Sequence, residues 1–293
     1  MEDKPKIRVS QSVAGFSQRA QDTWGLSEWL GWNDPNQNVL FFGLYTKNDY
    51  DTFLRHKGKK TIFWCGSDIQ NLNGNYDSRR ILKLFPETEH WCENETEAEG
   101  LKRAGVEAKI CPSFLDNINN YPLSYKHSKT PHIFLCGHDK REEEYGLELV
   151  KRIAPRLPDT TFHIYGINPN SPYFSTIKNP LDSMAEIDSE CPNIWYHGKI
   201  PEGQFNNEIT QYQCGLRPNE HDGFSEVIAK SVLLGQYPIS KISYEKIWNY
   251  KTEDELVALI DKLKFMTTPN IEARSYYLKK INNFPWCQRK YAE

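Results

Sequence analysis

The chain has 293 residues, of which 38% are hydrophobic, and its mean hydropathy is −0.70. This length is enough for two cores of ordinary size, so we expect two domains. Lys and Arg number 36 against 39 Asp and Glu, and the sequence pI is near 6.3. This balance excludes binding of nucleic acid or of an anionic membrane through the overall field, so such a partner would need a local patch.

Neither a targeting signal nor a metal site is expected. Residues 1–12 are charged and lack an apolar run, and the longest apolar run, residues 39–45, is only long enough for a strand, so we expect no signal peptide and no membrane span. The seven cysteines form no Cys-x-x-Cys pair and the histidines no His-Glu-x-x-His, which argues against zinc. Cysteines in or beside expected strands indicate reduced thiols and a cytoplasmic location: Cys65, Cys111, Cys136 and Cys214.

Short apolar runs alternate with helical patterns in the first 120 residues. We expect strands at residues 6–9, 38–43, 60–65, 89–92 and 108–111, and helices at residues 18–32, 49–56, 78–85 and 96–104. Strands separated by helices of this length are typical of βαβ units and a parallel sheet. A polar stretch with Asn and Pro, residues 116–131, then interrupts the pattern and is interpreted as an interdomain linker.

The alternation starts again after this linker. Strands are expected at residues 132–137, 161–166 and 193–198, helices at 142–154 and 202–211, and an irregular loop up to residue 188. The predicted domains are therefore 1–120 and 121–262. Residues 263–293 are expected to be helical, with aromatic residues available for packing: Tyr276, Tyr277, Phe284 and Trp286.

Residues 215–235 are the most informative segment. Arg217, Glu220, His221 and Asp222 come before the turn Gly223-Phe224-Ser225, which leads into an apolar-periodic helix. The first turn of a helix has unpaired backbone N–H groups and the positive end of the helix dipole, which together favour anions. The pattern therefore predicts a phosphate site, with Ser225 as the N-cap.

This segment resembles the donor-binding motif of GT-B glycosyltransferases, most closely the retaining family 4 type. Asp222-Gly223-Phe224-Ser225 occupies the positions of an acidic-Gly-Phe-Gly motif, and Gly137, Gly166 and Gly198 end three preceding strands in the same order. The resemblance implies an α/β protein of GT-B fold. Two Rossmann-like domains, a nucleotide-sugar donor domain at 121–262 and an acceptor domain at 1–120, would have parallel sheets facing across a cleft, and the C-terminal helices would return to the N-terminal domain.

The sequence departs from the family pattern at two places. Lys230 stands where the family has a glutamate that binds the nucleotide ribose, and an ammonium group cannot accept a hydrogen bond. Glu226, one helical turn earlier, is the alternative acceptor. His138 stands at a usual arginine and Tyr145-Gly146 replaces Lys-Gly, so Arg217 is expected to hold the diphosphate, assisted by Lys140 or Arg141.

The resemblance implies transfer of a sugar from a UDP- or GDP-linked donor, without a cofactor or a metal. We expect Arg217 to stabilise the leaving diphosphate and Asp222 to orient the sugar, with His221 and the cleft-facing Asp68 as further catalytic candidates. Each residue also has a structural alternative: a helix cap for Asp222, an ordinary turn for Asp68, a solvated strand end for Arg217. The donor-binding candidates are Gly15, His138, Lys140, Arg141, Gly166, Gly198, Glu220, Gly223, Phe224, Ser225 and Glu226.

Two other functions stay open, because a fold alone does not decide function. One is a degenerate, non-catalytic module that binds a nucleotide or a partner protein, and the other is a sugar-nucleotide epimerase. The acceptor could be a glycan, a lipid, a small molecule or a modified nucleic-acid base. The basic C-terminal stretch is either a weak contact for a polyanion or membrane surface, or a solvated helical face: Lys262, Lys264, Arg274, Lys279, Lys280, Arg289 and Lys290.

Overall fold

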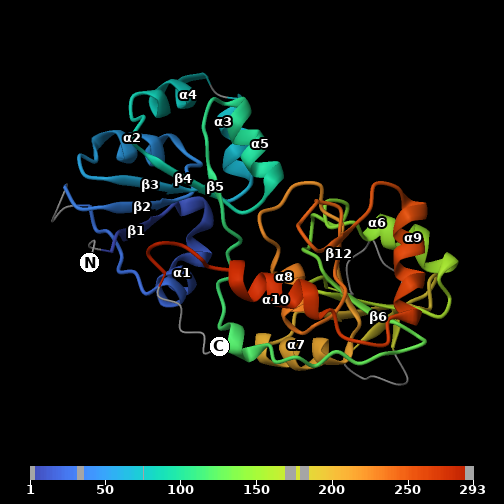
Figure 1. Ribbon diagram of the computed structural model, residues 1–293. Helices are drawn as coiled ribbons and strands as arrows, with labels where there is room; N and C mark the ends of the chain where they lie inside the picture. The colour runs from blue at the N-terminus through green and yellow to red at the C-terminus, as the bar shows by residue number, and fades with distance from the viewer. Residues whose placement is uncertain (1–3, 32–35, 75, 169–175, 179–184, 288–293) are drawn as a thin grey trace. The chain divides into compact units, whose positions relative to one another are not determined.

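Five parallel strands near the N-terminus form one sheet in the order β1-β2-β3-β4-β5 (Figure 1). The computed structural model describes residues 4–31, 36–74, 76–168, 176–178 and 185–287. The strands alternate with helices, as the sequence predicts, and their bounds are β1 (Lys6–Val9), β2 (Val39–Phe42), β3 (Lys60–Phe63), β4 (Glu89–Cys92) and β5 (Lys109–Ile110).

The helices of this part are η1 (Gln11–Phe16), α1 (Ser17–Trp24), α2 (Lys47–Arg55), α3 (Ser67–Gly74), α4 (Tyr76–Lys83), α5 (Glu95–Arg103) and η2 (Ile118–Asn120). Helix α1 ends well before the predicted residue 32, because Gly25 adopts the left-handed conformation (φ +63°) that terminates helices. Residues 32–35 lie outside the described part. Helix α3 was not predicted from the sequence.

The chain divides into two units, each described by itself. Among the described residues, unit 1 takes in those of 1–119, 221–224 and 279–293, and unit 2 those of 120–220 and 225–278. The predicted boundary at residue 263 therefore differs from the observed one, since residues 263–278 belong to unit 2. A four-residue piece of the 215–235 segment belongs to unit 1.

Both faces of the unit 1 sheet are covered. Trp24 of α1 packs on one face, where Phe284 and Trp286 of the C-terminal segment join the same core. The opposite face packs against α2 and α5 through residues such as Phe53 and Leu101. Figure 1 shows α1 below this sheet and α2 and α4 above it. Helices on both faces are characteristic of a doubly wound, Rossmann-like unit.

Unit 2 contains an eight-stranded sheet in the order β13-β12-β11-β6-β7-β10-β9-β8. All pairings are parallel except β10 with β9 and β9 with β8, a short hairpin in the predicted irregular loop. The bounds are β6 (His132–Cys136), β7 (Thr161–Tyr165), β8 (Thr176–Lys178), β9 (Glu186–Asp188), β10 (Ile194–Gly198), β11 (Cys214–Arg217), β12 (Ile239–Ser240) and β13 (Trp248–Asn249).

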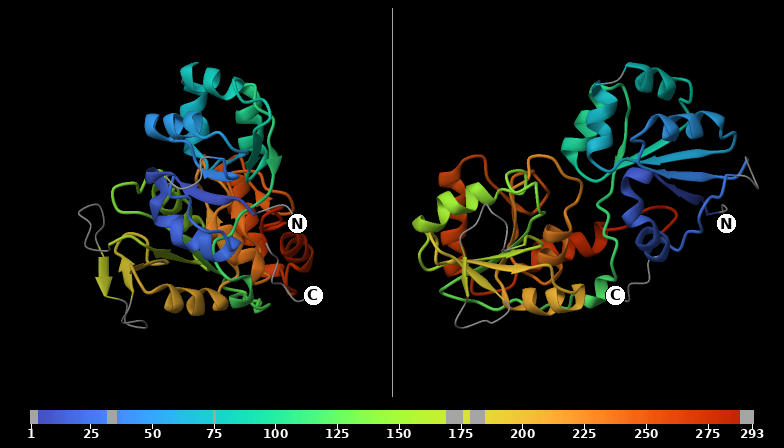
Figure 2. Two further views of the ribbon diagram at one scale, coloured as in Figure 1. Left: turned by 90° about the vertical axis from the view of Figure 1, so that its left-hand side faces the viewer. Right: turned by 180° about the vertical axis from the view of Figure 1, so that it is seen from behind.

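The helices of unit 2 lie on both faces of its sheet. Leu147 of α6 and Leu256 of α9 share one apolar core with the strands, and Phe205 of α7 packs against Phe134 and Tyr165 on the other face. Figure 2 shows α7 on the side of the sheet away from α6 and α9. The bounds are α6 (Leu147–Ile153), η3 (Ala154–Arg156), α7 (Glu202–Glu208), η4 (Ile209–Gln211), α8 (Glu226–Leu233), α9 (Glu253–Lys262), η5 (Leu263–Phe265) and α10 (Ile271–Lys280), whose last two residues belong to unit 1.

Candidate functional site

The strand order of unit 2 has a switch point between β6 and β11. From β6 the chain proceeds to β7 and β10 on one side, and it then crosses to β11 and β12 on the other side. At such a point the two neighbouring loops at the carboxyl ends of the strands diverge and leave a crevice, which is where α/β sheets bind ligands. His138, just after β6, and Arg217, the last residue of β11, flank it.

Three predicted cationic or polar side chains meet around one aromatic ring at this switch point. The Arg217 guanidinium lies 4.8 Å from the centre of the Tyr145 ring, and the Arg141 guanidinium lies 5.6 Å from it. The His138 ring stacks on Tyr145 with 6.5 Å between ring centres. A guanidinium on a ring face is held in orientation by that ring, and the Arg141 guanidinium is held further by its hydrogen bonds to the Glu144 carboxylate. Sequence reasoning missed the role of Tyr145, which it interprets only as a replacement for the family's lysine.

Packing or backbone conformation favours glycine at the three strand ends, Gly137, Gly166 and Gly198. A Cβ at Gly166 would lie 2.6 Å from the carbonyl oxygen of Gly137, and one at Gly137 would overlap Ile167. The Gly166 N–H donates to the Gly198 carbonyl at 2.7 Å, and both residues have positive φ. Backbone packs directly on backbone here. Close packing together with a positive φ therefore explains Gly166, and a positive φ explains Gly198, without a ligand.

The N-terminus of α8 is capped as the sequence predicts. The Ser225 Oγ accepts a hydrogen bond from the Val227 N–H at 3.2 Å, which identifies Ser225 as the N-cap. Asp222 lies three residues before this cap, so the structural alternative in which Asp222 caps the helix is wrong. Glu226, the first residue of α8, is half-buried, and Phe224 is buried.

Lys230 has an unexpected environment within α8. Its side chain is only 4% exposed, and its ammonium group donates to Glu202 Oε1 and to Asn206 Oδ1 of α7, both at 3.0 Å. The ring centres of Phe205 and Tyr121 lie 5.1 and 5.7 Å from the ammonium nitrogen. Lys230 therefore links α8 to α7.

Within unit 1, residues 221–224 are held by the Glu93-Asn94 pair after β4. The Asn94 Nδ2 donates to the carbonyl oxygens of Asp222 and Gly223, at 3.0 and 3.3 Å. A Cβ at Gly223 would overlap the carboxylate of Glu93. Because Asn94 also caps α5, accepting from the Glu97 N–H at 2.9 Å, one side chain fixes both the helix and this segment. Only glycine fits at position 223.

Buried carboxyl groups surround this contact. Burial raises the pKa of Glu93 to about 8, and the neighbouring Asp222 adds to the rise. Burial, followed by the charge of Glu93, raises the pKa of Glu97 well above its usual value. Ser113 donates to Glu93 through both its N–H and its hydroxyl. Burial raises the pKa of a carboxyl group because its charged form loses solvation, and a neighbouring negative charge adds to the rise.

A hollow of about 130 Å³ in unit 1 borders the same residues. Its walls include the α3 side chains Gln70 and Asn73, the α5 side chain Glu97, and the exposed His221 with the half-buried Asp222. The structure therefore brings together two of the four predicted catalytic residues, His221 and Asp222, beside polar side chains that can hydrogen-bond hydroxyl groups.

Asp68 does not lie at a surface, contrary to our expectation. It is 0% exposed, and its carboxylate accepts hydrogen bonds from the N–H groups of Cys65 (3.1 Å) and Leu44 (3.3 Å). Burial raises the pKa of Asp68 to about 7 against the effect of these donors. Asp68 joins the loops after β2 and β3, and its burial leaves it a structural role in place of the proposed contact with substrate.

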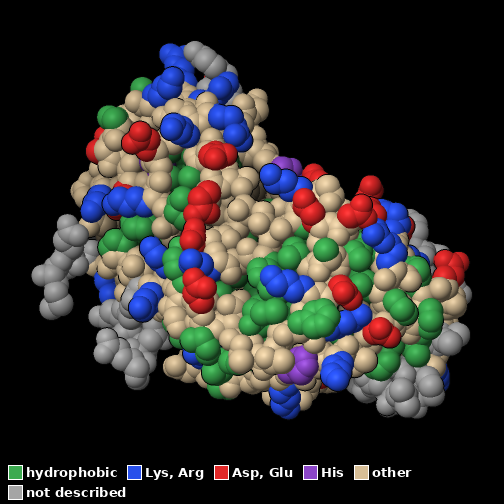
Figure 3. Space-filling view, turned by 45° about the vertical axis from the view of Figure 1, so that its right-hand side comes forward, with side chains coloured by type: hydrophobic (Ala, Val, Ile, Leu, Met, Phe, Trp, Pro, Cys, Tyr) green, Lys and Arg blue, Asp and Glu red, His purple; other side chains and the backbone are tan. Residues whose placement is uncertain are grey.

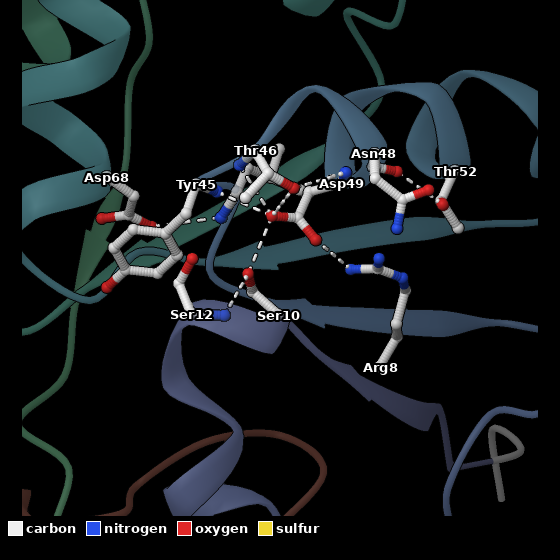
Figure 4. Close-up of polar contacts among 10 residues, drawn as sticks. Arg8, Ser10, Ser12, Tyr45, Thr46, Asn48, Asp49, Thr52 and Asp68 are labelled. Carbon is white, nitrogen blue, oxygen red and sulfur yellow. Dashed lines mark hydrogen bonds and ion pairs between the residues drawn. The ribbon is translucent and has the colours of Figure 1, made fainter.

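A further buried carboxylate, Asp49, organises the first loops of unit 1 (Figure 4). It accepts hydrogen bonds from Arg8 and Ser10, both at 2.7 Å, and from the N–H groups of Tyr45 and Thr46. Burial opposes ionisation, but the bonds from Ser10 and Arg8 prevail and lower the pKa of Asp49. Sequence reasoning missed this network, which a capping-box pattern from Thr46 to Asp49 could have indicated.

The remaining predicted binding residues are exposed. Gly15 lies in η1, and an added Cβ would meet nothing within 4 Å, so the fold does not require glycine there. Lys140 adopts φ +70°, and its N–H donates to Glu142 at 3.1 Å. Arg141 forms an ion pair with Glu144, and Glu220 is exposed in the loop after β11.

Several cations of the basic C-terminal stretch are engaged within unit 2. Lys264 forms ion pairs with Asp159 and Asp261, and the Arg274 Nε donates to the Leu233 carbonyl at 2.6 Å. Lys262 lies over the Trp248 ring. These contacts favour the interpretation of the basic C-terminal stretch as a helical face over its interpretation as a polyanion site. Arg289 and Lys290 lie outside the described residues.

No model of a protein family matches the sequence, and no curated protein matches it. Solved structures do match. TarM aligns over 84% of this chain and 53% of its own, with 12% identity and a TM-score of 0.56. Anabaena HepE in complex with UDP and glucose aligns over 83% of this chain and 73% of its own, with 11% identity and a TM-score of 0.56. Sucrose-phosphate synthase from Thermosynechococcus elongatus aligns over 90% of this chain and 72% of its own, with 12% identity and a TM-score of 0.57. The chain spans about half the length of TarM.

These likenesses establish the fold and nothing finer. The chain is an α/β protein with two Rossmann-like units, the fold of the GT-B glycosyltransferases. In the part of the chain that the structure describes, no three His, Cys, Asp or Glu side chains are grouped so that they could hold a metal ion. Within the same residues, every helix is too short or too polar to span a bilayer.

Proposed function

We propose that this chain is a cytoplasmic glycosyltransferase that transfers a sugar from a nucleotide diphosphate sugar to an acceptor. The observation that carries the proposal is the group of Arg217, Arg141 and His138 around Tyr145 at the switch point of unit 2. Negative charge develops on the diphosphate as the bond to the sugar breaks, and oriented guanidinium groups stabilise that charge. The GT-B fold is consistent with this chemistry.

The finer assignments belong to the same proposal. We propose a retaining, metal-independent transfer of the family 4 type, with no cofactor besides the donor substrate and with either UDP or GDP in that donor. HepE and the pneumococcal O-GlcNAc transferase GtfA are described in complex with UDP, so UDP-sugars are the first donors to test. Glu226 is the proposed ribose contact, because Lys230 is engaged with α7.

A thermal-shift screen of UDP- and GDP-sugars tests the proposal, followed by a hydrolysis assay on the hits. A ligand that binds only the folded state raises the unfolding temperature by mass action. We expect at least one nucleotide sugar to raise it and to be hydrolysed slowly in the absence of an acceptor. If no nucleotide sugar binds at millimolar concentration, the proposal is wrong.

Asp222 is tested separately, by Asp222→Asn. Because Ser225 is the N-cap, this substitution leaves the cap of α8 intact while it removes a charge. We expect turnover of the donor to fall at least tenfold while binding of the sugar-free nucleotide diphosphate changes less than about twofold. Equal turnover in both proteins would exclude a role for Asp222 in turnover.

A non-catalytic module is the second candidate, and Lys230 favours it. Lys230 stands at the sequence position of the ribose-binding glutamate in the family that this sequence resembles, and its ammonium group is held by Glu202 and Asn206. A binding module would respond to nucleotide in the thermal-shift screen yet turn over no donor, either by hydrolysis or by transfer. Product analysis of the hydrolysis assay therefore decides between the two candidates.

A further inference from the structure

Unit 1 carries a strongly basic pocket that the proposed function does not use. The pocket has a volume of about 340 Å³ and is lined by Arg79, Arg80 and Lys83 of α4, and by Arg103 at the end of α5 with the adjacent Ala104 and Gly105. Among the residues that the structure describes, no acidic side chain lines it. Figure 3 shows Lys and Arg side chains gathered at the top of the view, in the part of unit 1 that carries α4.

Helix dipoles account for only part of this arrangement. Arg80 and Lys83 lie in the last turn of α4 and Arg103 in the last turn of α5, where cations complement the negative end of a helix. That effect needs no concave surface and no convergence of two helices. Among the described residues, Arg80, Lys83 and Arg103 form no ion pair, whereas Lys109 and Arg141 on the surface do. Converging cations repel each other unless an anion lies between them.

The pocket adjoins the hollow at Asp222. Arg103 lines both, and α5 runs from Asn94, which holds the Asp222 carbonyl, to Arg103. A helix of nine residues is roughly 13 Å long. A chain-like ligand of that length, with an anionic group at one end, would therefore contact both the pocket and Asp222.

We propose that this basic pocket binds phosphate groups. The guanidinium groups of Arg80 from α4 and Arg103 from α5 line the same space, and planar guanidinium groups bind phosphate oxygens in pairs. Lys83 adds a point charge. The ligand class is a phosphate-bearing molecule, either a soluble oligophosphate chain or a lipid headgroup.

Tripolyphosphate is the soluble probe, titrated by calorimetry into the full chain. The titrations use an Arg217→Ala background, so that the proposed donor site does not contribute. We expect binding that weakens as the NaCl concentration rises from 50 to 300 mM, because salt screens the attraction between the exposed cations and the phosphate groups. Arg80→Gln/Lys83→Gln should weaken it at least about tenfold, the scale of one or two lost charged hydrogen bonds. Lys57→Gln/Lys59→Gln removes the same charge from exposed positions of unit 1 outside the pocket and should leave the affinity unchanged.

A second arm uses phosphatidylcholine vesicles with and without 30% phosphatidylglycerol. If the protein sediments only with the anionic vesicles, and Arg80→Gln/Lys83→Gln abolishes this while the control does not, the pocket binds a lipid headgroup. If tripolyphosphate binds, and Arg80→Gln/Lys83→Gln weakens this binding while the control does not, the pocket binds a soluble phosphate chain. The proposal is overturned if neither probe binds, or if both double variants lose binding equally. Donor hydrolysis by Arg80→Gln/Lys83→Gln should equal that of the unaltered chain, so failure here and failure of the proposed function are separate results.

Discussion

Arg217 is the residue on which the proposed chemistry depends most. The face of the Tyr145 ring orients its guanidinium. Because Arg217 is the last residue of β11, its backbone is held by the sheet, which reduces the entropy lost on binding a diphosphate. Lysine at this position would keep the charge but lose the planar fork and the stacking. Charge and geometry can therefore be separated by substitution.

We predict that Arg217→Ala weakens binding of the nucleotide sugar by about 1.5–3 kcal/mol, the usual value of a charged hydrogen bond. Arg217→Lys should recover less than half of this loss. Donor affinity is measured by calorimetry, with circular dichroism as the check that the protein is folded. Unchanged affinity in folded Arg217→Ala would exclude the role, and full recovery by lysine would show that charge alone is needed.

The residue type at position 223 is constrained by the space that the Glu93 side chain occupies. We predict that Gly223→Ala destabilises the protein by about 1–3 kcal/mol, the usual cost of overpacking, because its Cβ would overlap the Glu93 carboxylate. Adding Glu93→Ala should relieve most of the loss. Gly15→Ala is the matched control, with open space around it. Urea unfolding measures the unaltered chain, both single variants Gly223→Ala and Glu93→Ala, the double variant and the control. Additive losses in the double variant would contradict the overlap.

At the scale of elements, α7 and α8 are joined by a polar contact whose two partners differ in solvation. The Lys230 side chain is 4% exposed and that of Glu202 is 55% exposed. Removing the buried cation leaves a carboxylate that water can solvate, whereas removing its acceptors leaves a buried charge without compensation. The cost of breaking the contact should therefore depend on which partner is lost.

We predict that Glu202→Ala/Asn206→Ala lowers the free energy of unfolding by roughly 2–4 kcal/mol, and Lys230→Met by less than about 1.5 kcal/mol. The aromatic rings of Phe205 and Tyr121 can pack against the methionine, which supports the smaller value. Chemical denaturation gives both numbers. A larger loss for Lys230→Met would mean that the cation has a further partner in the native protein.

At the scale of the whole molecule, buried carboxyl groups make stability depend on pH. The pKa values of Asp68, at about 7, and Glu93, at about 8, are raised above those of the unfolded chain, so the folded protein retains protons that the unfolded chain releases. Stability from these groups is therefore complete below pH 4 and declines as pH rises toward 8. Asp49 acts in the opposite sense, because its pKa is lowered, and contributes stability that is lost in acid.

We predict that the free energy of unfolding falls between pH 5 and pH 8, by about 1.4 kcal/mol per pH unit for each proton retained. The side chain introduced by Glu93→Gln is uncharged at every pH, so this variant should lose the part of the slope that about one retained proton contributes. Glu107 is an exposed acidic residue of unit 1, and Glu107→Gln should leave the slope unchanged. Urea unfolding at four pH values gives the slopes. Identical slopes in Glu93→Gln and the unaltered chain would contradict the assignment.

The sequence by itself determined the class of the fold and most of its elements. Alternating apolar runs and amphipathic segments are local signals, and β1, β4 and α7 begin where they are predicted to begin. The Ser225 cap is equally local, because it depends on a side chain and a backbone N–H two residues away. The α6 start was predicted five residues too early, since Gly146 takes a left-handed conformation against Pro218, a contact distant in sequence.

Only the tertiary structure decided which residues share a site. The role of Tyr145 as a platform, the burial of Asp68 and the link from Lys230 to α7 all depend on elements that are far apart in sequence. Burial reverses what a residue type suggests: the acid expected to face the cleft joins two loops, and the lysine at the family's ribose-binding position holds two helices together. Periodicity reports which face of an element is apolar, but the desolvation and hydrogen-bond partners that set a polar residue's role exist only once the chain is folded.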